Sequence, residues 1–122
     1  MLESHFFFTC VEGVRTFVKT DFYEIVEACV NKKLNTINIE WFDDKSICIV
    51  LCSKGYPDKF KNEIEIKNLK KMNLKENEFI FHAGTKFFNN QVLSNGGRVL
   101  NFVIRSKEFN KSRNKILKLI DQ

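Results

Sequence analysis

The clearest helical pattern in the first third of the chain begins at Asp21. Asp21 followed by Glu24 forms an N-cap with a capping-box acid three residues later. The apolar positions that follow fall on one helical face, at Phe22, Ile25, Val26, Cys29 and Val30. The spacing predicts a helix over about 21–33, ending on two lysines that suit the helix dipole. Residues 1–18 show no clear period and stay unassigned.

The middle of the chain shows strand patterns. Ile37, Ile39 and Trp41 alternate with polar residues, which is typical of a half-buried strand. The run over 46–52 is apolar and rich in isoleucine, and it predicts a central strand. Ile64 and Ile66 alternate with charged residues and predict a short edge strand.

The second half of the chain predicts a series of strands followed by a helix. Strands are expected over 79–82, 86–88, 91–93 and 98–105. Asn89-Asn90 predicts a two-residue hairpin turn, because asparagine tolerates positive φ. Ser106 is expected to cap a helix over about 107–121. The inner face of that helix is predicted to carry Phe109, Ile116, Leu117 and Ile120.

Strands without strict alternation with helices predict an α+β fold. We expect a small, mostly antiparallel sheet, a β-meander, flanked by the helices over 21–33 and 107–121. The core is expected between the apolar face of the first helix and strands 47–52 and 98–104, with Trp41 at least half buried.

Length and composition favour one small domain. A chain of 122 residues fits a single domain. Its longest apolar run, 47–52, is far shorter than the ~18–20 residues that cross a bilayer, and its first residues lack the basic start of a signal peptide. The four cysteines form no C-x-x-C pair, so we expect small buried hydrophobes in a reducing cytoplasm and no metal site.

The net charge of +5 comes from 16 lysines and 4 arginines against 15 acids. The lysines are scattered, whereas a nucleic-acid site needs a basic stripe with interleaved aromatics. We therefore expect no nucleic-acid and no membrane partner, and a salt titration against DNA would test the weaker nucleic-acid alternative. No glycine-rich nucleotide motif and no complete catalytic set occur, so no catalytic residue is predicted.

Three segments place unusual residues at turns. The first is Ser53-Lys54-Gly55-Tyr56-Pro57, which a simple strand end would also explain. The second is His82-Ala83-Gly84-Thr85-Lys86, where small residues let a ligand approach backbone N–H groups, and where a strand bend is the alternative. The third is Asn95-Gly96-Gly97-Arg98, a hairpin turn whose arginine opens an apolar strand and needs a partner.

Together these segments resemble one family. Ser53-Lys54-Gly55-Tyr56-Pro57, Phe81-His82-Ala83-Gly84-Thr85-Lys86 and Ser94-Asn95-Gly96-Gly97-Arg98-Val99-Leu100, in this order, are similar to the C-terminal domain of the phosphoribosylamine–glycine ligases, or glycinamide ribonucleotide synthetases. Lys19-Thr20-Asp21, the helix after it and Trp41 also match. The resemblance divides the chain into an unmatched segment, 1–18, and a C-terminal-like domain, 19–122.

The resemblance implies an ATP-grasp ligase of purine biosynthesis. Such enzymes join glycine to phosphoribosylamine with ATP and magnesium, through a glycyl phosphate, and the C-terminal domain closes one side of the active site. In related purine enzymes a lysine and an arginine of this domain hold the ribose 5-phosphate, and the matching positions here are Lys86 and Arg98. The supporting turn residues are His82, Gly84, Thr85, Gly96 and Gly97.

The chain also departs from the family. The metal-binding segment that precedes the Lys-Thr-Asp match is absent from residues 1–18, as is the family's tail after Gln122. We therefore expect a fragment that lacks the ATP-grasp body, binds phosphoribosylamine or its glycinamide product, holds no cofactor itself and is inactive alone. ATP and magnesium are implied only for the full-length enzyme, and the missing body is a possible partner.

Two alternatives stay open at this point. The chain could be a stand-alone anion-binding or interaction module that retains the fold without catalysis. At the level of the site, Arg98 could pair with a nearby acid such as Glu78 or Glu108 instead of an anion.

Overall fold

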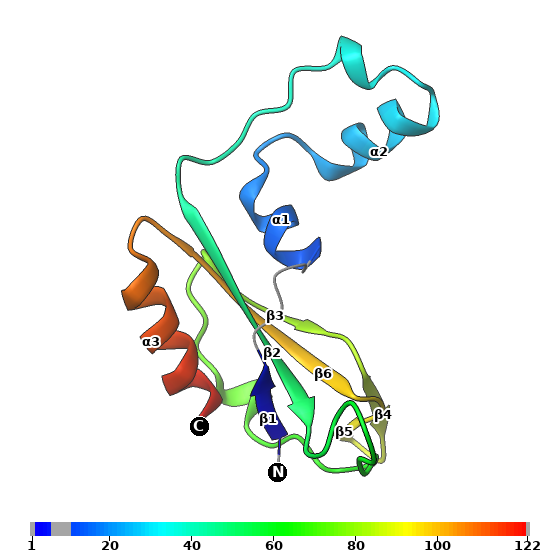
Figure 1. Cartoon of the computed structure of the whole chain (residues 1–122), viewed down its shortest axis with the longest axis vertical. Helices are drawn as coiled ribbons and strands as arrows, with labels where there is room; N and C mark the ends of the chain where they lie inside the picture. Colours follow the sequence, from blue (N-terminus) through cyan, green and yellow to red (C-terminus); the bar gives the residue numbers. More distant parts are fainter. Residues whose placement is uncertain (1, 6–10, 122) are drawn as a thin grey trace.

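A four-stranded antiparallel sheet forms the centre of the molecule (Figure 1). The computed structural model describes residues 2–5 and 11–121. The strand order is β1-β2-β6-β3, and every pairing is antiparallel. These strands are β1 (Leu2–His5), β2 (Lys45–Ser53), β3 (Glu78–His82) and β6 (Arg98–Ser106). The predicted α+β class with an antiparallel sheet is confirmed, as are its two long apolar strands.

The core lies between this sheet and α3 (Phe109–Ile120). Alternation along β2 and β6 turns one set of side chains toward the helix. Ile49 lies opposite Phe102 in the register, and Phe102 is 2% exposed. The helix contributes Ile116 and Leu119, which are both buried. Figure 1 shows α3 running along this face of the sheet.

The boundaries of α3 agree with the predicted 107–121 to within two residues. Its N-cap is Glu108, not Ser106, although the Ser106 hydroxyl accepts a hydrogen bond from the Glu108 amide at 3.2 Å. Phe109 is 43% exposed, so its placement on the inner face was wrong. Leu119 is buried there instead, three residues after Ile116 on the same helical face.

A shorter helix, α1 (Val11–Phe17), packs on the opposite face of the sheet. A Cβ added at its Gly13 would lie 3.7 Å from the Cβ of Cys48, and the Thr16 hydroxyl lies 3.3 Å from that of Ser46. The Arg105 guanidinium, on the same sheet face, donates to the Thr16 carbonyl at 2.8 Å. Both β1 and α1 fall in the segment that sequence patterns left unassigned, and Phe6-Phe7-Phe8 lies outside the described residues.

The first predicted helix exists but does not cover the sheet. It is α2 (Phe22–Val30), with Asp21 as N-cap: the Asp21 carboxylate accepts from the Tyr23 amide at 2.8 Å. The helix ends before 33 because Lys32 adopts φ 55° and the Lys33 amide donates to the Ala28 carbonyl, the pairing of a Schellman-type cap. A 3₁₀ turn, η1 (Leu34–Thr36), follows.

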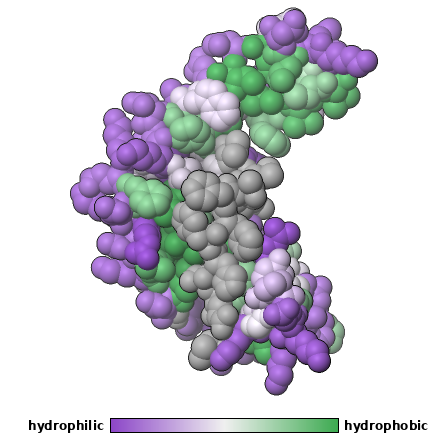
Figure 2. Space-filling model, viewed as in Figure 1, coloured by the Kyte–Doolittle hydropathy of each residue, from purple (hydrophilic) through white to green (hydrophobic). Residues whose placement is uncertain are grey.

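The expectation that α2 forms one side of the core was wrong. Val26 is 45% exposed and Val30 is 76% exposed. Figure 1 shows α2 projecting beyond the end of the sheet, and Figure 2 shows hydrophobic residues at the surface of this part of the molecule. The apolar periodicity identified the helix correctly but could not say which surface its apolar face meets.

Residues 37–41 do not form the predicted strand. Only an isolated bridge joins Trp41 to Val18, and the Trp41 ring packs against Phe17 at 5.8 Å between centroids. Trp41 is 48% exposed, which narrowly meets the expectation that half of it is buried. The segment is an extended connection between α2 and β2.

The Asn-Asn hairpin is confirmed. β4 (Thr85–Phe88) pairs with β5 (Gln91–Ser94), and Asn89 and Asn90 take φ values of 47° and 62°. β4 and β5 form a separate two-stranded sheet. The strands of the main sheet do not follow the predicted meander order, because β6 lies between β2 and β3. The predicted strand at 64–66 is not regular, although its backbone bonds β5 and an isolated bridge joins Glu65 to Leu93. A second 3₁₀ turn is η2 (Leu69–Lys71).

The cysteine prediction holds in part. Cys52 is fully buried and Cys48 is partly buried, but Cys29 is exposed on α2, and Cys10 lies outside the described residues. No helix in the described part of the chain is long and apolar enough to span a membrane.

Candidate functional site

The three turn segments meet at one end of the sheet. Because β6 is antiparallel to both β2 and β3, its start lies beside their ends. The Ser53 amide donates to the Gly97 carbonyl at 2.7 Å, and the Asn95 amide donates to the Gly84 carbonyl at 2.8 Å. The Ser53 hydroxyl adds a hydrogen bond to the Gly96 carbonyl at 2.8 Å. Ser53 and Gly96 lie 43 residues apart in the sequence, so segments distant along the chain form one hydrogen-bonded unit.

Two glycines in this unit are required by close packing. A Cβ on Gly84 would collide with the Arg98 carbonyl oxygen and lie 3.1 Å from the Gly96 Cα. A Cβ on Gly97 would collide with the Tyr56 ring. Gly96 takes φ 154°, at the edge of the range that favours glycine. The glycines therefore hold the second and third turn segments, and Tyr56 of the first, in contact.

Substituting Gly84 with alanine should destabilise this end of the sheet. The new methyl group meets backbone atoms, which cannot rotate away, so we expect a loss of about 1–3 kcal/mol in the free energy of unfolding. Gly13→Ala is the matched control: its Cβ would meet ordinary contacts at 3.7 Å and longer, and alanine favours a helix. Urea denaturation measures both, and equal stability of the two variants would contradict the role given to Gly84.

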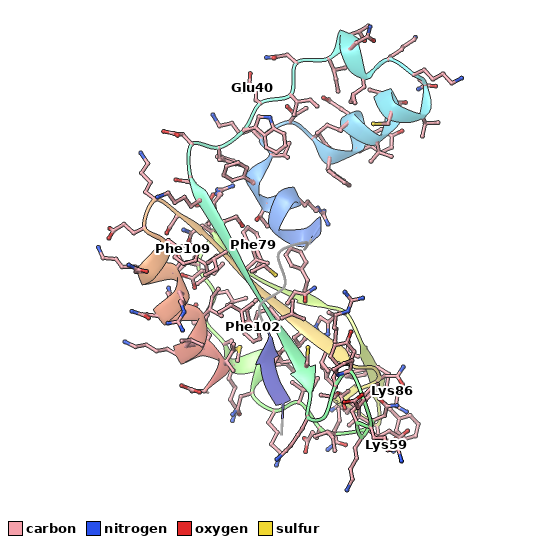
Figure 3. The ribbon with its side chains drawn as sticks, viewed as in Figure 1. Glu40, Lys59, Phe79, Lys86, Phe102 and Phe109 are labelled. Carbon is pink, nitrogen blue, oxygen red and sulfur yellow. The ribbon has the colours of Figure 1, made fainter. Side chains whose placement is uncertain are left out.

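Lys86 lies on β4 at this same end of the sheet, and α2 lies at the other end of the molecule (Figure 3). Its ammonium group forms an ion pair with Glu63 at 2.5 Å. The hydrogen bond and the positive charge of Lys86 lower the pKa of the exposed Glu63 carboxyl below its ordinary value of 4.5. An anion that binds Lys86 must therefore compete with this carboxylate at neutral pH.

An open cavity of about 440 Å³ lies beside Lys86. His82 and Thr85 also line it, and the His82 Nδ1 lies 2.8 Å from the Thr85 hydroxyl. Lys70, whose ammonium lies 5.8 Å from the centre of the Phe87 ring, adds a second cation. Four cationic or hydrogen-bonding side chains on an open cavity can hold a small anion.

Arg98 is the first residue of β6 and is exposed. Within residues 2–5 and 11–121, its side chain forms no recorded ion pair or hydrogen bond. The acids considered as its partners are engaged elsewhere, Glu78 with Lys115 and Glu108 with Lys111. Arg98 does not line the cavity beside Lys86, so the meeting of the two cationic groups on one ligand stays a prediction.

Sequence reasoning missed Glu63 and the packing role of Tyr56. Glu63 precedes the Lys86 position by 23 residues, and its φ of 64° is unusual for a glutamate, so no local pattern pointed to the pair. Ser94 was also passed over: it is fully buried, and its hydroxyl accepts from the Ile64 amide at 3.0 Å. These residues tie the 63–66 segment to the hairpin.

No group of three or more histidine, cysteine or acidic side chains in the described part of the chain could hold a metal ion.

Comparison with known proteins assigns the sheet and its turns to a family. The family model described as "Phosphoribosylglycinamide synthetase, C domain" matches residues 46–122. The chain belongs to this family. The match contains all three turn segments, as well as Lys86 and Arg98, and it confirms the resemblance inferred from the motifs.

Individual relatives agree with this assignment. The chain is 35% identical over 102 residues to a phosphoribosylamine–glycine ligase of Caldanaerobacter subterraneus, covering 84% of this chain and 24% of the relative. It is 38% identical over 93 residues to that of Fusobacterium nucleatum, covering 75% and 22%. The crystal structure of phosphoribosylamine–glycine ligase from Thermotoga maritima matches with a TM-score of 0.54 at 26% identity, covering 80% of this chain and 24% of that one.

The C-domain chain spans about a quarter of the length of these bacterial ligases. Its similarity to them also extends upstream of the family match. A similarity over 102 residues must include at least 25 residues before Ser46, because the family match covers only 77. The Caldanaerobacter relative therefore shares part of the segment before Ser46, which carries α2.

Proposed function

We propose that this chain is the C-terminal, substrate-side domain of a cytoplasmic phosphoribosylamine–glycine ligase, and that Arg98 and Lys86 hold the phosphate of phosphoribosylamine or of its glycinamide product. The family and the names of its relatives support the enzyme class. The observation that carries the site is the junction of the three turn segments beside Arg98, which is exposed at the start of β6 and has no side-chain partner among residues 2–5 and 11–121.

The chemistry of the two cations suits this role. An arginine presents a fork of N–H donors that matches a phosphate, whereas a lysine supplies a compact positive charge. The close packing that Gly84 and Gly97 allow holds the turn segments together beside Arg98. His82 and Thr85, whose polar side-chain atoms lie 2.8 Å apart, line the same cavity as Lys86.

The rest of the reaction belongs to other parts of the ligase. Joining glycine to phosphoribosylamine through a glycyl phosphate needs an ATP cradle and magnesium-held phosphates. We assign these to the roughly three quarters of the relatives' length that this chain does not span. The isolated chain is therefore proposed to be inactive, and any binding of substrate to it to be weak.

We expect no ligase turnover from the isolated chain. Incubated with glycine, phosphoribosylamine, ATP and magnesium, it should release no ADP above a no-protein control. A chimera in which this chain replaces the matched C-terminal quarter of the Caldanaerobacter ligase should release ADP only when both substrates are present. ADP release by the isolated chain would contradict the proposal.

The chimera also distinguishes the proposed ligase domain from the second candidate function, a stand-alone anion-binding module. A stand-alone anion-binding module would bind ribose 5-phosphate as the isolated chain but would not support turnover in the chimera. That candidate is favoured by Arg98 alone, whose side chain has no partner within the described part of the chain, since anion binding needs no ATP site. A folded chimera without turnover, beside an active parent ligase, would point to the module.

A further inference from the structure

Lys70 is a cationic side chain of the cavity beside Lys86 to which the proposed site gives no role. The two lysines come from different segments, η2 and β4, and both line the open cavity of about 440 Å³. This cavity lies at the end of the molecule where Figure 3 labels Lys86. Arg98 does not line it. Lys70 is therefore the cation that the fold brings to the same cavity as Lys86.

The positive charge of Lys70 is not offset by an acidic side chain. Among residues 2–5 and 11–121, Lys70 forms no recorded ion pair, whereas Lys86 pairs with Glu63. The Lys70 ammonium group lies 5.8 Å from the centre of the Phe87 ring. A cation–π contact attracts an ammonium group to the ring face and leaves its charge uncompensated. Lys70 can therefore bind an anion without breaking an ion pair, which Lys86 cannot.

The backbone around Lys70 is fixed on both sides. Leu69 and Met72, which flank it in the sequence, both pack against the hydrophobic core. The Lys71 amide donates to the Asn68 carbonyl at 2.8 Å and closes the 3₁₀ turn. Because the turn is anchored in this way, the Lys70 ammonium group moves only within the reach of its own side chain and stays near the cavity.

The lining of the cavity has two chemically distinct parts. One part is cationic or hydrogen-bonding, and the other is apolar and consists of Leu69, Phe87 and Val92. Its volume of about 440 Å³ lies within the range of small-molecule pockets, about 300–1,000 Å³. A phosphate group suits the cationic part, and the C–H groups of a sugar ring can pack against the apolar part. The cavity therefore matches a phosphorylated sugar.

We propose that Lys70 contacts the phosphate of the substrate together with Lys86, and that this further ammonium group sets the preference for a phosphorylated ligand. The inference rests on the proposed function and adds a residue to the phosphate site named there. A phosphate monoester carries close to two negative charges at neutral pH. Glu63 offsets the charge of Lys86, so Lys70 supplies the positive charge that the cavity otherwise lacks for such a dianion.

Competitive acetylation of the lysines locates the ligand on the unaltered chain. The chain is treated with a limiting amount of acetic anhydride, with and without ribose 5-phosphate, and acetylation of each lysine is read by mass spectrometry. Saturating ligand should slow the acetylation of Lys70 and Lys86 by about threefold or more, because a nearby phosphate keeps an ammonium group protonated and unreactive. Lys71, the next residue of η2, is exposed and does not line the cavity, so its acetylation should not change.

Neutral and conservative variants test the contact itself. Lys70→Gln should weaken the binding of ribose 5-phosphate by about fivefold, because one charge-assisted contact is lost. Lys71→Gln removes the same charge from the same turn and is the matched control, with a change of less than about twofold because solvent screens a charge outside the cavity. Lys70→Arg keeps the charge and should stay within about twofold of the native chain. Amide shifts of residues 82–86 in NMR titrations measure all four proteins.

Three outcomes contradict the contact. Equal weakening by Lys70→Gln and Lys71→Gln shows an effect of net charge and no contact by Lys70. Protection of Lys86 without protection of Lys70 removes Lys70 from the phosphate site and leaves the rest of that site standing. Equal protection of Lys70 by inorganic phosphate at the same concentration removes the sugar from the proposed ligand class.

Turnover of the chimera with the Caldanaerobacter body separates this inference from the proposed function. An active chimera, beside an isolated chain whose Lys70 is not protected, removes only the Lys70 contact. An inactive chimera, beside an isolated chain whose Lys70 is protected, removes only the proposed function. The absence of both lysine protection and amide shifts overturns the contact and the phosphate site together.

Discussion

Phe102→Ala should cost about 3–5 kcal/mol of the free energy of unfolding, the largest stability loss expected of a single substitution in this chain. Phe102 is 2% exposed on the central strand β6, opposite Ile49 and against the α3 side of the core. Removing its ring leaves a cavity in a sheet position that is paired on both sides, where the backbone cannot collapse inward.

The measurement is urea denaturation followed by circular dichroism, with Phe88→Ala as the matched control. Phe88 is 59% exposed on the β4–β5 hairpin, so its truncation should change the stability by less than about 0.5 kcal/mol. A domain of this size is expected to have a total free energy of unfolding of about 5–15 kcal/mol. A loss of about 5 kcal/mol would therefore leave a domain at the lower end of that stability largely unfolded at 25 °C. A loss below about 1 kcal/mol would contradict the position of the core.

The sheet could be predicted from the sequence because its strands carry strong local signals. The β-branched run at 46–52 and the apolar run at 98–105 became the two central strands, and Asn89-Asn90 became the hairpin turn. Antiparallel pairing of these strands with 79–82 then brings the three turn segments to one end. The junction at Gly84 and Gly97 thus follows from strand identity and direction.

The arrangement of the helices could not be predicted from the same patterns. The apolar faces of α2 and α3 both look fit to cover a sheet, but only α3 does so, while that of α2 stays exposed. An amphipathic helix specifies an apolar neighbour without saying whether it belongs to its own domain. The Glu63–Lys86 pair was equally hidden, because it depends on the 63–66 segment lying beside β5.

Arg98→Ala should weaken the binding of ribose 5-phosphate to the isolated chain by about 10- to 100-fold. A charge-assisted hydrogen-bonded contact contributes about 1.5–3 kcal/mol, and 1.4 kcal/mol corresponds to a factor of ten. The contact is available because the Arg98 side chain has no ion pair to break within the described residues. Amide shifts of residues 82–86 and 95–98 in NMR titrations measure it, and Arg113→Ala, an exposed arginine on α3, is the control.

Lys86 should respond differently, because it already has a partner. Lys86→Ala should also weaken binding, whereas Glu63→Gln should strengthen it by removing the carboxylate that competes with the ligand's phosphate. The lowered pKa of Glu63 keeps that carboxylate charged at neutral pH, so the competition fades only as the pH falls through that lowered value. An affinity for ribose 5-phosphate that is unchanged in Arg98→Ala, or a Glu63→Gln variant that binds it more weakly, would contradict the phosphate site.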